Sequence, residues 1–417
     1  MTLIKTSLLN GIAVVVKMLT LLGINKILAI YVGPSGYAAI GQFQNAVQMI
    51  TTFASGAVNT GVVKYTAEYA DDESAQHKVW QTAGAIALAG TFIASVCIAL
   101  FSVDLANLFL NNESFSGVFL WFSATLVLFT LNTLLLSILN GKKEIAKYVL
   151  ANISGSLFSL VVTTVLVFKF GLYGALVSLA VYQSLTFATT FFLCIKSKWF
   201  KLEYLVGRID KAVALNLAKY TAMALTTALS VPMSHILIRN YLSVQFGLEA
   251  AGYWEALWRL SSAYLMVVTT TLGVYYLPRL SELKTYHEIR QEILQGYKII
   301  LPVAALCGLL IYMLRDLIII LLFTRDFAPM RELFAWQMIG DTLKIGSWIL
   351  AYMMLGKAMF KAFIASEIVF SLTFYLLTVY LTGWFGFVGF SWAHAINYGF
   401  YFIVMYFMVF RRLHKII

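Results

Sequence analysis

Long apolar blocks alternate with short charged loops along the whole chain. A hydrocarbon core about 30 Å thick is crossed by about 20 apolar residues in a helix, so the pattern predicts about twelve transmembrane helices. The expected spans are 8–32, 38–62, 79–101, 118–139, 148–168, 172–195, 214–238, 250–277, 297–314, 334–355, 362–381 and 385–410. The first block is long enough to span and has no small-residue cleavage site, so it is predicted to be a helix and not a signal peptide.

The basic residues gather in alternate loops. About 20 Lys and Arg residues fall in the loops on one side, and five fall on the other: Lys169, Arg239, Arg315, Arg325 and Arg331. Because basic loops stay in the cytoplasm, both termini are predicted to be cytoplasmic, which requires an even number of spans. Segment 281–296 is expected to lie as an amphipathic helix at the inner surface. Segment 317–323 is too short to span and is expected to form an interfacial turn or a re-entrant piece.

The two halves of the chain resemble each other. Segment 170–174 (FGLYG) matches 385–389 (FGFVG), 141–142 (GK) matches 356–357, and 39–43 (AIGQF) matches 250–254 (AAGYW), at offsets of 211 to 215 residues. These matches predict six-helix lobes at 1–195 and 214–417, joined by a cytoplasmic linker at 196–213. The fold class is therefore all-α, polytopic and membrane-embedded, with a pseudo-two-fold axis along the membrane normal. Secondary transporters have this architecture, with the substrate between the repeats.

Composition and motifs exclude several other classes of protein. The 417 residues are 61% hydrophobic and only 12% charged, unlike a soluble domain. The net charge of +11 resides in loops between spans and accompanies no nucleic-acid-binding motif, so nucleic acid is not an expected partner. The three cysteines lack metal-binding spacing, and no catalytic or nucleotide-binding motif is present. We therefore expect no catalytic residues, no metal site, no cofactor and no enzymatic activity.

Charged residues at membrane depth are candidates for function because burying an unpaired charge is costly. Lys17 is expected near the midplane of the first span, and Lys26 on the opposite face, either toward a cavity or extended to the outer surface. Glu255 and Arg259 are four residues apart in the eighth span. They either neutralise each other or separate when Arg259 binds an anionic ligand.

Two further groups of polar residues are candidates. In the tenth span Asp341 and Lys344 are spaced for an ion pair, and Asp341 is the best coupling candidate because a mid-membrane carboxylate can exchange a proton. In the second span Gln44, Asn45 and Gln48 share roughly one face. That face either binds sugar hydroxyls or hydrogen-bonds to a neighbouring helix. Lys17 and Arg259, one from each lobe, are predicted to bind a diphosphate together, with Lys26 and Lys344 adding to a cationic cavity.

Four segments resemble the Wzx-type lipid-linked oligosaccharide flippases of the MOP exporter superfamily. They are 26–29 (KILA), 33–36 (GPSG), 61–65 (GVVKY) and the more specific 330–344 (MRELFAWQMIGDTLK). The last segment is similar to the corresponding helix in family members that act on enterobacterial common antigen lipid III and related O-antigen units. The resemblance extends over essentially the whole chain and implies a MATE-like fold.

The resemblance also implies a function. Members of this family move undecaprenyl-pyrophosphate-linked glycans from the cytoplasmic to the periplasmic leaflet of the bacterial inner membrane by alternating access. It implies that the partners are this glycan substrate, membrane lipids, and the polymerase and chain-length regulator of the same pathway. Ion coupling by proton or sodium is implied, without a named ion. Drug or other lipid export by the same superfamily is the alternative, although drug cations favour an acidic cavity and the deep charges here are mostly basic.

Overall fold

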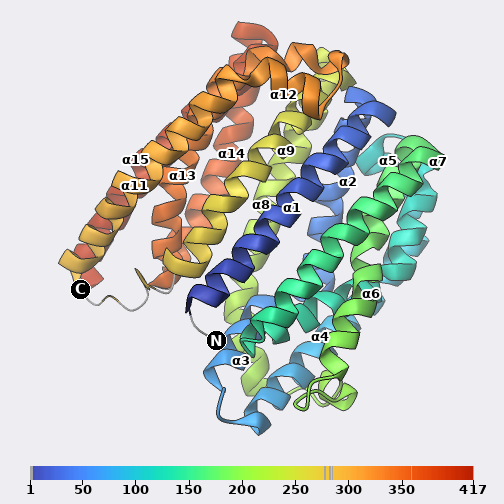
Figure 1. Ribbon diagram of the computed structural model, residues 1–417, viewed down its shortest axis with the longest axis vertical. Coiled ribbons are helices and arrows are strands. Elements are labelled where there is room, and N and C mark those ends of the chain that lie inside the picture. The colour runs from blue at the N-terminus through green and yellow to red at the C-terminus, as the bar shows by residue number, and fades with distance from the viewer. Residues whose placement is uncertain (1–2, 277–278, 281–282, 284, 358, 417) are drawn as a thin grey trace. The chain divides into compact units, whose positions relative to one another are not determined.

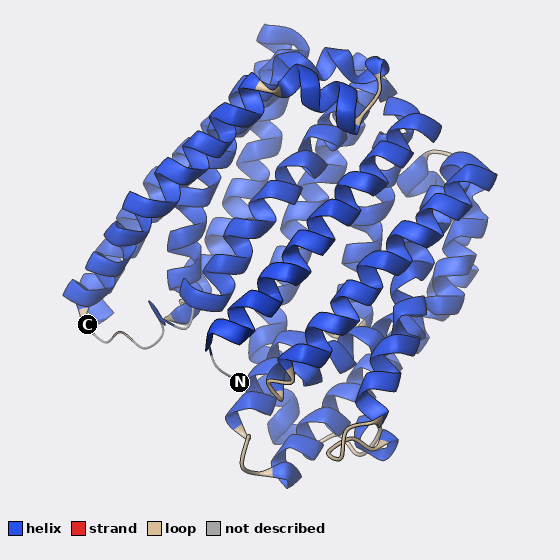
Figure 2. Ribbon diagram, viewed as in Figure 1, coloured by secondary structure: helices blue, strands red, loops and turns tan. Residues whose placement is uncertain are grey.

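The computed structural model describes residues 3–276, 279–280, 283, 285–357 and 359–416. In that part of the chain the regular elements are all helices, joined by short loops (Figures 1 and 2). They form two compact units: residues 1–32 with 39–232, and residues 33–38 with 233–417.

Unit 1 contains the helices of the first half of the chain. They are α1 (Leu3–Tyr31), most of α2 (Gly33–Ala54), α3 (Asn59–Glu68), α4 (Glu73–Leu100), α5 (Ser102–Leu110), η1 (Glu113–Phe115), α6 (Ser116–Gly141), α7 (Ile145–Ile195), η2 (Leu202–Leu205) and the first part of α8 (Lys211–Phe246). Its core surrounds the buried side chain of Trp80, whose indole donates to Thr66 at 2.8 Å.

Unit 2 contains the remaining helices and the first turn of α2. The helices are the second part of α8, α9 (Leu248–Thr271), the π-helical turn η3 (Leu272–Tyr276), α11 (Tyr286–Met313), α12 (Arg315–Leu322), η4 (Arg325–Leu333), α13 (Phe334–Gly356), α14 (Phe360–Phe385), η5 (Gly386–Val388) and α15 (Gly389–Ile416). The boundary between the units falls within α8, directly after Pro232. Proline lacks the backbone donor that would continue the helical ladder there.

The helices account for the expected number of spans. Seven helical stretches among the described residues are long and apolar enough to cross a membrane, and two of these, Ile145–Ile195 and Phe360–Arg411, are of double length. Three further helices, α2, α9 and α13, have 22, 24 and 23 residues and so reach spanning length. These three are less apolar because they carry most of the charged and amide residues predicted to be functional. The all-α fold with about twelve spans is confirmed.

The repeat is visible in the backbone of two helical hairpins. Gly171 has φ 54° and ψ −130°, and Gly386, at the matching position, has φ 64° and ψ −154°. Three residues later, a Cβ on Gly174 would lie 2.0 Å from the Leu166 carbonyl oxygen, and one on Gly389 would lie 2.3 Å from that of Leu381. Only glycine accommodates both the positive φ and the close approach, which explains the FGxxG pattern in each half.

Several predicted boundaries are wrong. The second expected span is two helices, because Gly56 and Ala57 take positive φ values between α2 and α3. The expected surface helix at 281–296 is the start of α11, which continues without a break from Tyr286 into the apolar segment. Residues 281, 282 and 284 of that prediction lie outside the described residues. Segment 317–323, expected to be too short to span, falls mostly in the eight-residue helix α12, which agrees with that expectation.

The segment expected to be a linker packs against α4 within unit 1. The backbone N–H of Asp210 donates to the Thr82 hydroxyl at 3.1 Å. A Cβ on Gly84 would lie 1.8 Å from the Leu205 carbonyl oxygen, so this part of the chain lies directly on the helix. Residues 196–213 therefore belong to the packed body of unit 1.

Candidate functional site

A polar cavity of about 320 Å³ lies in unit 1, between α1, α2, α6 and α7. Its polar lining residues are Lys17, Thr20, Gln44, Asn152, Ser156, Ser159, Tyr182, Gln183 and Thr186. Lys17 and Gln44 remain exposed to this space. Lys26, predicted as a second cation here, is half-buried elsewhere on α1 and is absent from the lining. The cavity thus combines one ammonium group with amides and hydroxyls.

The amide groups of this cavity are fixed by hydrogen bonds. Asn132 donates to the Gln183 side-chain oxygen at 2.8 Å, and Gln183 donates to the Tyr182 hydroxyl at 3.2 Å. Asn152 donates to the Tyr148 carbonyl at 2.8 Å. Such bonds hold the side chains in defined orientations, as selective binding of a polar ligand requires.

The predicted amide face of α2 is divided between two environments. Gln44 lines the cavity just described, whereas Gln48 lines a second cavity of about 320 Å³ with threonine and serine residues of α2, α3, α6 and α8. Asn45 is buried, and its Nδ2 has no hydrogen-bond partner. The three residues therefore do not form one continuous binding face. One α-helical turn separates Gln44 from Gln48, which is enough to place them in different pockets.

In unit 2 a buried carboxylate lies between two guanidinium groups. Glu255 Oε2 lies 3.3 Å from Arg239 Nε, and Glu255 Oε1 lies 3.8 Å from Arg259 Nη1. Arg239 is only 2% exposed, and its guanidinium carbon lies over the ring of Trp254, 5.3 Å from the centroid. The prediction that Arg239 lies in an outer loop is wrong, because α8 continues to Phe246 and carries Arg239 opposite Glu255. The predicted contact between Glu255 and Arg259 is present, but it belongs to a cluster with net positive charge.

A second buried cluster surrounds Asp341. Oδ2 of this carboxylate accepts hydrogen bonds from the hydroxyls of Ser261 at 2.5 Å and Tyr264 at 2.6 Å. Oδ1 lies 3.1 Å from Nε2 of His394 and 3.3 Å from Nε2 of Gln337. Asp341 is 1% exposed, so these four neighbours replace its contact with water.

Lys344 has different partners from those predicted. Its ammonium lies 4.0 Å from the ring centroid of Trp258, 5.0 Å from that of Trp348 and 5.2 Å from that of Tyr398. Among the described contacts the group paired with Asp341 is His394 and not Lys344. An aromatic cage stabilises a buried cation through the negative faces of the rings. In place of the expected ion pair between Asp341 and Lys344, Asp341 is paired with His394 and Lys344 lies within the aromatic cage.

Close packing of α13 and α15 brings His394 to Asp341. A Cβ on Gly340 would lie 2.2 Å from the His394 ring, so a larger residue there would separate the two helices. His394 is itself fully buried and hydrogen-bonded to Asp341.

Sequence reasoning missed the contributions of α7 and of Arg239. Asn152, Tyr182 and Gln183 lie in strongly apolar segments, and an amide at membrane depth is the signal that was available for two of them. No comparable signal marks Ser261 or Tyr264, which reach Asp341 from α9.

Comparison with known proteins places the chain in a family. The family model described as polysaccharide biosynthesis protein matches residues 3–284. The lipid III flippases of Escherichia coli (strain K12) and Shigella flexneri are each 30% identical over 368 residues, which cover 88% of this chain and 88% of each relative.

Solved structures support the same fold. A multidrug resistance MATE family transporter of the MOP superfamily, in its inward-facing conformation, is similar with a TM-score of 0.78 over 96% of this chain and 95% of that one, at 15% identity. A MOP superfamily transporter from Pyrococcus furiosus, in which the reverse polarity of the binding pocket suggests a different function, gives a TM-score of 0.62 at 14% identity, covering 96% and 95% of the chains. The resemblance noted in the sequence is therefore confirmed: this chain is a multi-pass membrane protein of the polysaccharide biosynthesis protein family, with the fold of the MOP superfamily.

Proposed function

We propose that this protein is a flippase that moves undecaprenyl-pyrophosphate-linked oligosaccharide units from the cytoplasmic to the periplasmic leaflet of the bacterial inner membrane. The substrate class follows from the relatives named lipid III flippase, which match 88% of the chain. In this proposal both termini are cytoplasmic, as the distribution of basic loops predicts. Enterobacterial common antigen lipid III and O-antigen units are the two substrates that we consider.

The observation that carries the proposal is the composition of the cavity in unit 1. An ammonium group at Lys17 suits a phosphate, and the neighbouring amides and hydroxyls suit sugar hydroxyls. Arg259, in unit 2, is proposed to add a second cation for the diphosphate, since the arginine fork binds phosphate oxygens in pairs. A multidrug exporter is disfavoured because an ammonium in the cavity repels cationic drugs.

Transport is proposed to occur by alternating access, which the internal repeat supports. We propose that Asp341 is the coupling residue and that it exchanges a proton together with His394, at a distance of 3.1 Å. Sodium is the alternative ion, since a carboxylate with neighbouring hydroxyl oxygens also suits a hard cation. The polymerase and chain-length regulator of the pathway remain proposed partners.

Complementation tests this proposal. The gene is expressed in bacteria that lack their own flippase, either for the common antigen or for O-antigen, and surface glycan is measured. We expect the wild type to restore one glycan, Lys17→Ala to fail and Lys17→Arg to recover in part. The matched control is Lys169→Ala. Lys169 is exposed and lies just before the kink at Gly171 in α7, so its replacement should leave glycan export at the wild-type level. Failure to restore either glycan, together with increased resistance to cationic drugs, would overturn the proposal.

A further inference from the structure

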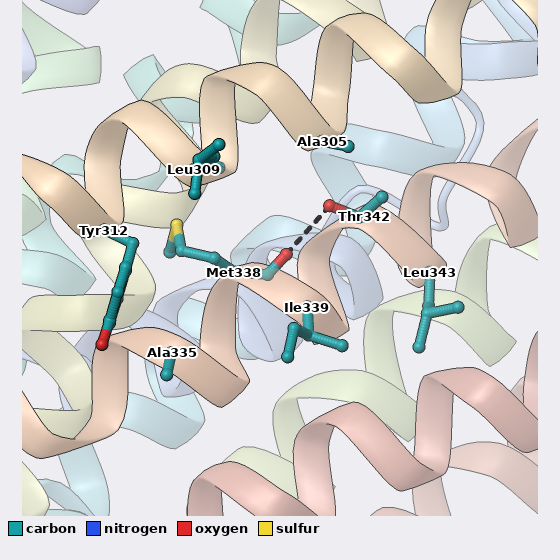
Figure 3. Close-up of a pocket in the computed structure, with 9 residues that line it drawn as sticks. Ala305, Leu309, Tyr312, Ala335, Met338, Ile339, Thr342 and Leu343 are labelled. Carbon is teal, nitrogen blue, oxygen red and sulfur yellow. Dashed lines mark hydrogen bonds between the residues drawn. The ribbon is translucent and has the colours of Figure 1, made fainter.

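An apolar groove of about 550 Å³ runs between α11 and α13 in unit 2. Figure 3 shows the lining residues Ala305, Leu309 and Tyr312 on one helix and Ala335, Met338 and Ile339 on the other, with Met338 pointing toward the first helix. Small residues, including Gly308, make the concavity, because the Met338 Cβ would be only 3.4 Å from a Cβ on Gly308. The volume lies within the range of small-ligand sites.

The groove presents almost no polar group along its length. The Thr342 hydroxyl is engaged with the Met338 carbonyl at 3.0 Å, as the dashed line in Figure 3 marks. The Tyr312 hydroxyl is the other polar side-chain group among the lining residues. A hydrocarbon chain is the ligand that such a surface accommodates without leaving polar groups unpaired.

One end of the groove is cationic. Tyr312 lines this end, and the Arg315 guanidinium lies 4.3 Å from its ring centroid and donates to its carbonyl oxygen at 2.8 Å. The neighbouring carboxylate of Asp316 is already engaged by Arg331, at 2.7 Å and 3.0 Å. The ion pairs found among the described residues include none to Arg315. Its charge therefore remains available to an anion.

The length of the groove matches one leaflet. From Ala335 to Leu343 the lining extends for eight residues of α13, which is about 12 Å, against about 15 Å for half of a hydrocarbon core. The groove begins at the end of the unit that carries α12 (Figure 1), whose Leu317, Ile320 and Leu321 are exposed apolar residues suited to the membrane interface. The cationic end is thus placed at headgroup level, with the apolar part below it.

We propose that this groove and Arg315 form a binding site for an anionic phospholipid, whose acyl chain lies along the groove and whose phosphate contacts Arg315. A resident lipid fits better than the polyprenyl chain of a transported substrate, because the groove is confined to one half of the bilayer. A lipid in the groove would also contact Met338, which packs against a residue that holds Asp341. Met338 lines the groove, and its sulfur lies 3.8 Å from the Tyr264 hydroxyl oxygen. That hydroxyl donates its hydrogen to Asp341 at 2.6 Å.

Lipid binding to the full-length protein tests this site directly. The detergent-purified protein is titrated with phosphatidylglycerol, phosphatidylcholine or undecaprenyl phosphate, and bound lipid is counted by native mass spectrometry. We expect phosphatidylglycerol to bind best. Arg315→Gln, which removes a charged hydrogen-bond donor, should weaken its binding by about tenfold. Ala305→Phe, which fills the groove from an exposed position, should reduce binding of all three lipids.

Arg325→Gln is the matched control, because Arg325 is exposed and lies outside the groove lining. It should bind phosphatidylglycerol as the wild type does. Equal binding of phosphatidylglycerol and phosphatidylcholine by every variant would show a non-specific lipid layer and overturn the proposal. Preferential binding of undecaprenyl phosphate that competes with phosphatidylglycerol would also overturn it. Because the readout is lipid binding, this result does not depend on which substrate is transported.

Discussion

At Glu255, two guanidinium groups approach one carboxylate in the interior of unit 2. Arg239 Nε is closer, at 3.3 Å, and Arg259 Nη1 is at 3.8 Å. Removing one partner of a buried ion pair is costly when it leaves the other charge unpaired. The closer contact to Arg239 means that Glu255 keeps a partner when Arg259 is removed. The cluster can therefore tolerate the loss of Arg259 more readily than the loss of Arg239.

The first prediction separates these two arginines. Arg259→Ala should abolish transport while inserting normally and melting close to the wild-type temperature, and Arg259→Lys should recover transport in part. Arg239→Ala should instead destabilise the protein by about 3–5 kcal/mol, because the closer partner of Glu255 is lost. Melting of the purified protein and glycan export in cells are the two measurements. Wild-type export by Arg259→Ala would assign this arginine to packing and remove it from the substrate site.

The second prediction concerns Asp341. An asparagine there has one oxygen in place of two to accept from Ser261, Tyr264, Gln337 and His394. Each buried donor left without an acceptor costs about 1–3 kcal/mol. Asp341→Asn is expected to lower transport at least about tenfold and to remove its dependence on pH, because the variant lacks the carboxylate that would exchange a proton with His394.

The control for Asp341 is Ser347→Ala, also on α13, where the hydroxyl donates only to the backbone of its own helix at 3.0 Å. This variant should keep both the rate and its dependence on pH. The groups facing Asp341 from the other packed elements are Tyr264 on α9 and His394 on α15, with Lys344 on its own helix. Transport by Asp341→Asn at the wild-type rate, with the wild-type pH dependence, would end the coupling proposal.

The residue contacts that could be predicted are those within one helix. The spacing of Glu255 and Arg259 is sufficient to predict their contact, because residues four apart lie on one face. The same rule predicted an ion pair between Asp341 and Lys344, which are three residues apart. In the structure Asp341 is paired with His394 from α15, and Lys344 lies against aromatic rings. Partners from other helices, including Arg239, depend on packing that the local pattern does not contain.

At the scale of helices and hairpins, the apolar blocks predicted the spans because each must cross a hydrocarbon core of fixed thickness. The break between α2 and α3 was missed because Gly56 and Ala57 interrupt the helix inside a continuous apolar block. The cavity contributions of α7 were missed because its amides are isolated in apolar sequence. Helix pairing, which brings Gln183 near Gln44 in one cavity, was not contained in the hydropathy pattern.

The third prediction concerns the α14–α15 hairpin. Gly389→Ala should destabilise the protein by about 1–3 kcal/mol, because the new Cβ would lie 2.3 Å from the Leu381 carbonyl oxygen and the backbone must move. Gly383→Ala is the matched control, since a Cβ there meets nothing within 4 Å in the interior of α14. It should be neutral or slightly stabilising, because alanine favours helix. Thermal unfolding in detergent distinguishes the two, and equal melting temperatures would contradict the proposed role of Gly389.

For the whole molecule, the repeat and the fold class were predictable because both follow from long-range regularities in the sequence. The matching glycines at 171 and 386 have the same role in each unit. The substrate site is less predictable because its polar groups come from different helices. The sequence indicated Lys17 and Gln44, and the structure adds Asn152, Tyr182 and Gln183 to the same cavity.

The fourth prediction concerns the two cations from the two halves. If Lys17 and Arg259 bind the same diphosphate, their effects on transport should not be additive, because loss of either one already removes most of the binding. The double variant should then transport about as poorly as each single alanine variant, measured as the rate of glycan export. If the fold-loss of export in the double variant equalled the product of the two single losses, Lys17 and Arg259 would act on separate steps.

Leaflet-resolved transport in proteoliposomes distinguishes a flippase from a membrane protein that moves no glycan. The purified protein is reconstituted with an undecaprenyl-pyrophosphate-linked oligosaccharide, and a membrane-impermeant glycan-binding or glycan-cleaving reagent reports which leaflet the glycan occupies. We predict that the wild type makes the inner-leaflet glycan accessible, and that Lys17→Ala does so at no more than about a tenth of that rate. A wild-type protein that leaves the glycan as protected as it is in protein-free vesicles, under either a proton or a sodium gradient, would contradict the assignment as a flippase.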